Sequence, residues 1–194
     1  MLLRQRSSSA SAAEVPDVLV GPPAVLDEWV KAGKADSTHR VVVGRIGVGV
    51  MVCDNAPLPK IATADDFKQS LLSAQSVVYN QASTGIYLEK LFDQLGIGEQ
   101  AKSKTTRYPD ATAVLGHISK GKPNEIGLGA TTVILEGESK GLKFVGPLPV
   151  EIQNYTTYAA IVITDGAASA TARAVLDYMT TVAAKKIFAT AGIE

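Results

Sequence analysis

Short apolar runs alternate with helical patterns along most of the chain. Continuous or alternating apolar residues, rich in Val and Ile, predict buried strands at 18–20, 40–53, 76–79, 105–108, 125–134, 142–145 and 155–164. Apolar residues at helical spacing predict helices at 24–32, 63–73, 86–95, 111–119, 167–179 and 182–190. Two successive strand–loop–helix units, 76–95 and 105–119, predict a parallel sheet. The fold class predicted from the pattern is therefore α/β.

The first part of the chain has a different character. Residues 1–14 are mostly small and polar, so we expect a disordered leader. This stretch lacks the apolar core of about 7–15 residues that a secretory signal needs. The longest apolar run, 46–53, is far shorter than the ~20 residues that span a bilayer. We therefore expect no signal peptide and no direct membrane insertion.

Composition removes several classes of function. The 194 residues include 46% apolar residues, enough for a core, and 19 basic side chains balance 19 acidic ones. A zero net charge offers no footprint for phosphate backbones, which argues against nucleic-acid binding. A single cysteine, Cys53, cannot form an intrachain disulfide, and one cysteine with two histidines argues against a Cys/His zinc site. We expect neither a metal nor another cofactor.

Familiar catalytic arrangements are not evident in the sequence. His39 lies in a polar turn, and His117 lies inside a predicted helix, where a structural role is favoured over a catalytic one. No Gly-x-Ser-x-Gly motif occurs. The glycines at 44, 47 and 49 have the wrong order for a nucleotide loop, so close approach of another segment explains them better.

Two predicted helix starts follow strands and are candidates for anion binding. The loop 80–85 ends in Ala82, Ser83, Thr84 and Gly85, whose backbone N–H groups and hydroxyls suit an oxyanion or a carboxylate. Asp110, Ala111 and Thr112 repeat this arrangement at the next helix. The alternative is that Ser83 and Asp110 are ordinary N-caps. That alternative is favoured for Asp110, because its charge repels anions.

Arginines and tyrosines near the strand ends are further candidates. Arg45 and Arg107 could each pair with a carboxylate through two hydrogen bonds, although exposed, solvated arginines are common. Tyr79 and Tyr108 directly precede the two candidate loops and could close over a ligand. Packing in the core with the hydroxyl at its rim is the alternative for the tyrosines.

Five segments together carry a resemblance to a known family: Pro16–Gly33, Arg45–Val50, Tyr79–Gly85, Glu125–Gly127 and Val145–Pro149. In order and spacing they resemble the molybdate-binding-protein-like branch of bacterial extracellular solute-binding proteins. These are type II periplasmic binding proteins that serve ABC transporters. The similarity extends from about residue 15 to residue 194.

The resemblance implies two α/β lobes joined by crossover strands, with an anion bound in the cleft between them. Lobe one would comprise 15–50 and 155–194, and lobe two 51–154. The ligand contacts implied for lobe two fall on Ala82–Gly85, on Ala111 and Thr112, and on Thr131. Arg45 is a further candidate, because its guanidinium group could pair with a carboxylate. The implied partners are a small anion and the membrane subunit of an ABC transporter.

Two departures from the family pattern affect this interpretation. Family members carry a signal peptide and two strand–helix units ahead of the segment that matches Pro16, so lobe one is predicted to be incomplete. The implied location is the periplasm, or the cytoplasm if the chain starts at its own Met1. A molybdate binder tends to have a tyrosine where this chain has Ala130 and Thr131, so an organic carboxylate is as plausible a ligand as molybdate.

Three functional hypotheses follow. The first is an anion-binding component of an ABC transporter. The second is an enzyme on the same scaffold, because some relatives in this branch resemble aconitate isomerase, with Arg107, Tyr79 and Asp110 as the candidate catalytic groups. The third is a non-binding interaction protein in which an exposed sheet edge of lobe one pairs with another chain.

Overall fold

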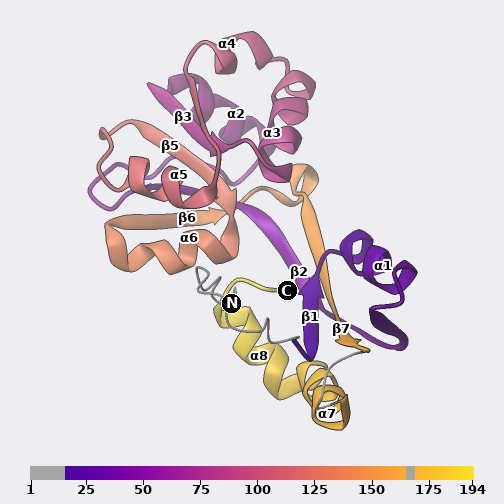
Figure 1. The fold of residues 1–194 in the computed structure, drawn as a ribbon. Helices are drawn as coiled ribbons and strands as arrows, with labels where there is room; N and C mark the ends of the chain where they lie inside the picture. The colour runs from indigo at the N-terminus through magenta and orange to yellow at the C-terminus, as the bar shows by residue number, and fades with distance from the viewer. Residues whose placement is uncertain (1–15, 165–168) are drawn as a thin grey trace, which may run out of the picture. The chain divides into compact units, whose positions relative to one another are not determined.

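The computed structural model describes residues 16–164 and 169–194, which form two compact units (Figure 1). Of the described residues, unit 1 contains 16–43, 159–164 and 169–180, and unit 2 contains 44–158 and 181–194. The predicted leader and the first residues of the helix predicted at 167–179 lie outside the described residues. The predicted lobe boundaries stay a prediction. The resemblance assigns residues 181–194 to lobe one, whereas the contacts of these residues place them in unit 2.

Unit 1 is a small sheet with helices. It contains β1 (Val18–Gly21), α1 (Pro23–Lys31), α7 (Ser169–Met179) and parts of β2 (Ala35–Cys53) and β7 (Tyr155–Ile163). The strand order is β1-β7-β2, and β1 pairs with β7 in antiparallel register. Leu26 of α1 is fully buried against Ile161 and Ile163 of β7, which joins the helix to the sheet.

Unit 2 holds the larger sheet. Its strands are β3 (Ser76–Asn80), β4 (Thr105–Tyr108), β5 (Glu125–Ala130), β6 (Leu142–Pro147) and the parts of β2 and β7 that lie in this unit. Its helices are α2 (Ala64–Ser73), α3 (Ser83–Gln94), α4 (Gly98–Lys102), α5 (Ala111–Ile118), α6 (Thr131–Gly137) and α8 (Val182–Thr190), with short 3₁₀ turns at Glu138–Lys140 and Val150–Ile152. Strand order is β2-β5-β3-β4, with β6 also on β2. The parallel pairs β3–β4 and β3–β5 confirm the predicted α/β class.

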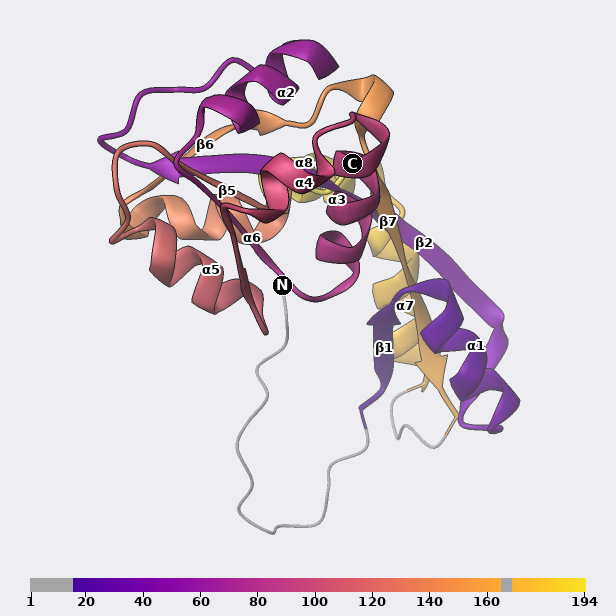
Figure 2. The same ribbon diagram turned by 90° about the horizontal axis from the view of Figure 1, so that it is seen from above.

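Helices cover both faces of the unit 2 sheet, as Figure 2 shows. On one face, Val77 and Tyr79 of β3 pack in a core with α2, α3 and α4. On the other face, Val78 packs with Val114 of α5 and Ile134 of α6. Successive β3 residues alternate between the two cores because strand side chains point to opposite faces. A strand buried on both faces explains the continuous apolar pattern from which it was predicted.

The structure corrects several predicted boundaries and adds one helix. α3 begins at Ser83, three residues before the predicted start, so Ser83, Thr84 and Gly85 belong to its first turn rather than to a loop. β5 ends at Ala130, and the rest of the strand predicted at 125–134 is α6. The β-branched residues there favour a strand, but burial of Ile134 against α5 stabilises the helix. The short helix α4 was not predicted.

The longest apolar run, 46–53, forms the last part of β2, a strand that begins at Ala35 rather than at the predicted residue 40. Val50, Met51 and Val52 in this run are almost completely buried. Within 16–164 and 169–194, every helix falls short of the length and apolar character needed to span a membrane.

Candidate functional site

Three helices of unit 2 begin at the edge of its sheet where the parallel strands β3, β4 and β5 end. β3, β4 and β5 end at Asn80, Tyr108 and Ala130, and α3, α5 and α6 follow at Ser83, Ala111 and Thr131. The carboxyl ends of parallel strands share an edge, so the N-termini of these helices gather there. Most of the predicted ligand-binding residues therefore lie at this edge, which we call the carboxyl edge.

The start of α3 has no side-chain cap among the described residues. Ala82 occupies the N-cap position in an extended conformation, and its methyl group offers no acceptor to the first-turn N–H groups. Asn80 Oδ1 accepts a hydrogen bond from the N–H of Ala82 at 3.1 Å, which fixes the turn out of β3. Ser83 is exposed, Thr84 is half-buried and Gly85 is buried. The alternative prediction of Ser83 as an N-cap is wrong, because Ser83 is the first helical residue.

Gly85 sets the path of this turn. A Cβ atom at this position would collide with the backbone carbonyl oxygen of Asn80 and would lie 3.2 Å from the Tyr79 ring. Only a residue without a side chain lets the first turn of α3 approach the end of β3 so closely. Gly85 thus shapes the start of α3 through its backbone, and its predicted ligand contact stays a prediction.

The start of α5 has a side-chain N-cap. Asp110 Oδ1 accepts a hydrogen bond from the N–H of Ala113 at 2.8 Å, so Asp110 is an N-cap, as the alternative interpretation held. Thr112 is exposed on the first turn. Ala111 lines a cavity of about 10 Å³ together with Asn80 and Gly129, a volume that leaves no room for an oxyanion.

The segment Gly192–Glu194 contacts two further predicted residues. Thr131 Oγ1, at the start of α6, donates a hydrogen bond to the carbonyl oxygen of Gly192 at 3.0 Å. Arg45 forms an ion pair with Glu194, with 3.0 Å between Nη2 and Oε2. β2 runs antiparallel to β5 with Val48 opposite Ala130, so Arg45 lies beyond the end of β5. Both side chains are thus near the carboxyl edge but already have partners from the chain.

A chain of hydrogen bonds holds α5 against the sheet. The hydroxyl of Tyr108 lies 2.8 Å from Nδ1 of His117, and Nε2 of His117 lies 3.3 Å from Oε1 of Glu125. Glu125 Oε2 accepts a hydrogen bond from the N–H of Lys122. Glu125 is only 8% exposed, so its charge depends on these partners. The contacts support the structural role predicted for His117; Glu125, which comes from the amino end of another strand, was not predicted.

The residues predicted for an isomerase do not all come together. Arg107 and Tyr79 line one cavity of about 490 Å³ beside α3, together with Glu89, whereas Asp110 caps α5 and does not line it. Arg107 Nη1 pairs with Glu89 Oε1 at 2.6 Å. Tyr79 is 2% exposed, and burial raises the pKa of its hydroxyl while a hydrogen bond from Thr105 opposes the shift. A buried phenol with a raised pKa is protonated at neutral pH and is a poor general base.

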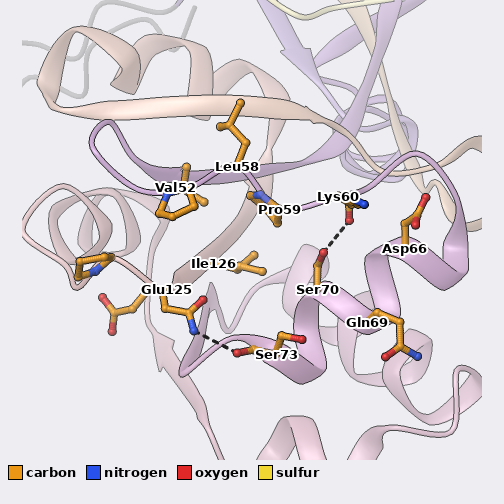
Figure 3. A pocket seen from close by; sticks show the side chains of 13 residues that line it. Val52, Leu58, Pro59, Lys60, Asp66, Gln69, Ser70, Ser73, Glu125 and Ile126 are labelled. Carbon is orange, nitrogen blue, oxygen red and sulfur yellow. Dashed lines mark hydrogen bonds between the residues drawn. The ribbon is translucent and has the colours of Figure 1, made fainter.

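A separate cavity of about 240 Å³ lies at the opposite edge of the sheet, between the end of β2 and the start of β5 (Figure 3). Ser70 donates a hydrogen bond to the carbonyl oxygen of Lys60, and Asn124 donates one to that of Ser73, so these polar groups of the wall already have partners. None of the predicted site residues lines it. Across the described part of the chain, no cluster of three or more His, Cys, Asp or Glu side chains is placed to hold a metal ion.

The model of the family described as bacterial extracellular solute-binding protein matches residues 4–194. The chain belongs to this family. This solute-binding protein is 29% identical over 182 residues to an aconitate isomerase from a Pseudomonas species, a match that covers 93% of the chain and 68% of that relative. The resemblance deduced from short sequence segments is thereby confirmed.

Two solved structures share the fold of this solute-binding protein. The periplasmic molybdate-binding protein of Azotobacter vinelandii has a TM-score of 0.68 at 14% identity, covering 92% of this chain and 78% of the other. A structure of PEB3 bound to L-phospholactate has a TM-score of 0.66 at 15% identity, covering 91% and 78%. The fold is therefore that of periplasmic binding proteins, as predicted.

Proposed function

We propose that this solute-binding protein binds a small anion at the start of α3 and delivers it to an ABC-type transporter. The observation that carries the proposal is the uncapped first turn of α3 at the carboxyl edge, where the parallel strands β3, β4 and β5 end. Its backbone N–H donors have no side-chain cap among the described residues, and the exposed Ser83 hydroxyl lies beside them. Membership of the solute-binding family supports binding without chemistry.

The physical case for an anion rests on the helix rather than on net charge. The N-terminus of a helix carries a partial positive charge of roughly half an elementary charge, and its first N–H groups point at a ligand placed there. The chain as a whole has a net charge of zero, so any attraction for an anion must be local. Two proteins of the same fold bind molybdate and L-phospholactate, and both ligands are anions. We take an oxyanion or an organic carboxylate as the ligand class.

The partners follow from the family. A solute-binding protein that performs no chemistry needs a membrane subunit to receive its ligand, and we propose that this subunit belongs to an ABC transporter. The proposed location is the periplasm, in keeping with the description of the family as extracellular. The proposal involves no nucleic acid and no insertion of this chain into the bilayer.

The test compares the protein with an Ala82→Asp variant. Sodium molybdate, citrate and trans-aconitate are each titrated while the unfolding temperature is recorded, with sodium chloride as the reference salt. An anion at one hundred times its Kd should stabilise the protein by about 2.7 kcal/mol. Asp at the N-cap would supply a carboxylate from the chain itself, which competes with the anion for the first-turn N–H groups. We therefore expect the affinity for the anion to fall at least tenfold in Ala82→Asp.

Gln94→Asp is the matched control, because it adds the same charge to an exposed position at the other end of α3. It should leave the anion response in place. The proposal is wrong if none of the three anions shifts the unfolding temperature, or if Ala82→Asp and Gln94→Asp reduce the response equally.

A second candidate function is isomerisation of a tricarboxylate. The observation that favours it is the 29% identity to an aconitate isomerase across 93% of this chain. Arg107 and Tyr79 are poor candidates for the isomerase site. The cavity that they line is also lined by three carboxylates, Glu89, Asp93 and Glu99, whose charges repel a tricarboxylate. Interconversion of cis- and trans-aconitate followed by NMR would establish the activity, and its absence at high protein concentration would exclude it.

A further inference from the structure

Arg45 and Tyr155 hold a carboxylate in this structure, and that carboxylate belongs to the chain itself. Arg45 Nη2 donates to Glu194 Oε2 at 3.0 Å, and the Tyr155 hydroxyl donates to Oε1 of the same carboxylate at 3.4 Å. The guanidinium carbon of Arg45 lies 3.9 Å from the centroid of the Tyr155 ring. One carboxylate is therefore contacted at both oxygens by a cation and a phenol that also stack on each other.

The backbone places Glu194 at this position. The N–H of Arg45 donates to the carbonyl oxygen of Glu194 at 2.7 Å, the N–H of Glu194 donates to that of Arg45 at 2.9 Å, and Ile46 forms a β-bridge with Ile193. A Cβ atom at Gly44 would lie 2.5 Å from Cγ2 of Ile193. Glycine at position 44 thus permits the segment Gly192–Glu194 to run along β2.

This arrangement lies at the same edge of the sheet as the proposed anion site. Val48 of β2 is opposite Ala130, the last residue of β5, and Arg45 is three residues farther along the antiparallel strand. Thr131, the first residue of α6, binds the same segment through Gly192. The segment therefore lies beyond the carboxyl end of β5, beside the start of α6.

We infer that Arg45 and Tyr155 form a carboxylate-binding subsite, that Glu194 occupies it in cis, and that the carboxylate of an organic-acid ligand replaces Glu194 there. The inference rests on the proposed function and narrows its ligand class from anions in general to organic carboxylates. The guanidinium fork matches the two coplanar oxygens of a carboxylate, and its flat face stacks on an aromatic ring, which an ammonium group does not do equally well. The bound Glu194 side chain shows directly which chemical group this pair of residues accepts.

The exposure of the pair allows exchange. The Arg45 and Glu194 side chains are 52% and 51% exposed, and ion pairs that are open to solvent contribute little to stability. Burial raises the pKa of the Tyr155 hydroxyl and the Glu194 charge raises it further, against the opposing effect of Arg45, so the hydroxyl keeps the proton that it donates. An incoming carboxylate can therefore displace Glu194 and use the same two donors.

The experiment measures citrate and molybdate affinity by isothermal titration calorimetry in the protein and in Glu194→Gln. Removing the cis carboxylate frees the subsite, and an exposed ion pair of ordinary strength implies a two- to six-fold gain in citrate affinity. Arg45→Gln in the Glu194→Gln background should remove this gain. Glu136→Gln removes a charge from an exposed position on α6 and should leave citrate affinity unchanged.

A second measurement follows the Arg45 side-chain signals by NMR during the citrate titration, which shows binding at the guanidinium even if the heat is small. The inference is overturned if Glu194→Gln leaves citrate affinity and these signals unchanged, or if molybdate gains as much as citrate. If both anions bind and respond to Ala82→Asp but not to the Arg45 and Glu194 changes, the proposed function stands and the subsite falls. If citrate binds through Arg45 but ignores Ala82→Asp, the subsite stands and the α3 site falls.

Discussion

The starts of α3 and α5 lie at the same edge of one sheet and follow the same strand–turn–helix pattern, but they differ in their N-caps. At α5 the carboxylate of Asp110 accepts a first-turn N–H group, so the chain satisfies its own donor. At α3 the equivalent position is Ala82, which offers no acceptor. A missing N-cap costs about 1 kcal/mol, and a helix that goes without one keeps its donors for another partner. This difference is the reason for proposing the start of α3, rather than that of α5, as the anion site.

The largest expected effect concerns the close approach that shapes the α3 start. Gly85→Ala should lower the free energy of unfolding by about 2–4 kcal/mol, because its Cβ atom would overlap the carbonyl oxygen of Asn80. Urea denaturation measures the loss. Gly116→Ala on α5 is the matched control: its Cβ atom would meet nothing within 4 Å, so the change should stabilise by about 0.5–1 kcal/mol. Equal effects at the two glycines would contradict this account of the α3 turn.

The next effect separates the capped start from the open one. Asp110→Ala should destabilise the protein by about 0.5–2 kcal/mol through loss of the α5 cap. Ser83→Ala, at the exposed first residue of α3, should change stability by less than about 0.5 kcal/mol. Thermal or urea unfolding of the two variants gives both numbers. A larger loss for Ser83→Ala than for Asp110→Ala would mean that Ser83 supports the fold rather than a ligand.

The smallest effect concerns α6, whose first hydroxyl is already used by the chain. Thr131→Val should cost about 0.5–1.5 kcal/mol, because the carbonyl oxygen of Gly192 loses its hydrogen-bond donor. Thr132→Val makes the same chemical change at the next residue and serves as the control. Molybdate affinity should be the same in both variants; a selective loss in Thr131→Val would place this hydroxyl in the anion site.

Much of this architecture could be predicted from local pattern. The two-face burial of β3 produces a continuous apolar run, and Thr63, predicted to begin a helix, caps α2 through the N–H of Asp66. The helix start at Ser83 was missed because Ser, Thr and Gly favour loops, whereas the decisive fact is the fit of Gly85 against Asn80. α6 was missed because its Thr and Val residues favour strands when packing is not known.

The candidate site divides in the same way. Asp110 as a cap can be deduced from a short stretch of sequence, because its partner Ala113 is three residues away, whereas the exact start of α3 could not be. The partner of Arg45 could not be deduced, since Glu194 lies 149 residues away and no motif joins them. Glu125 likewise depends on a contact between two elements, with His117 on α5 and Glu125 on β5. Pairings of this kind depend on the tertiary fold, which a single sequence does not display.

The pairing of Gly192–Glu194 with β2 has a consequence for the order in which the protein can fold. The backbone groups of Arg45 leave the ribosome long before residues 192–194 are synthesised, so during translation this part of β2 has no partner from that segment. Contacts between residues so far apart in sequence form slowly, because a long loop must close first. Unit 2 can therefore build most of its sheet during synthesis, but it becomes complete only after the chain has passed through unit 1 and returned.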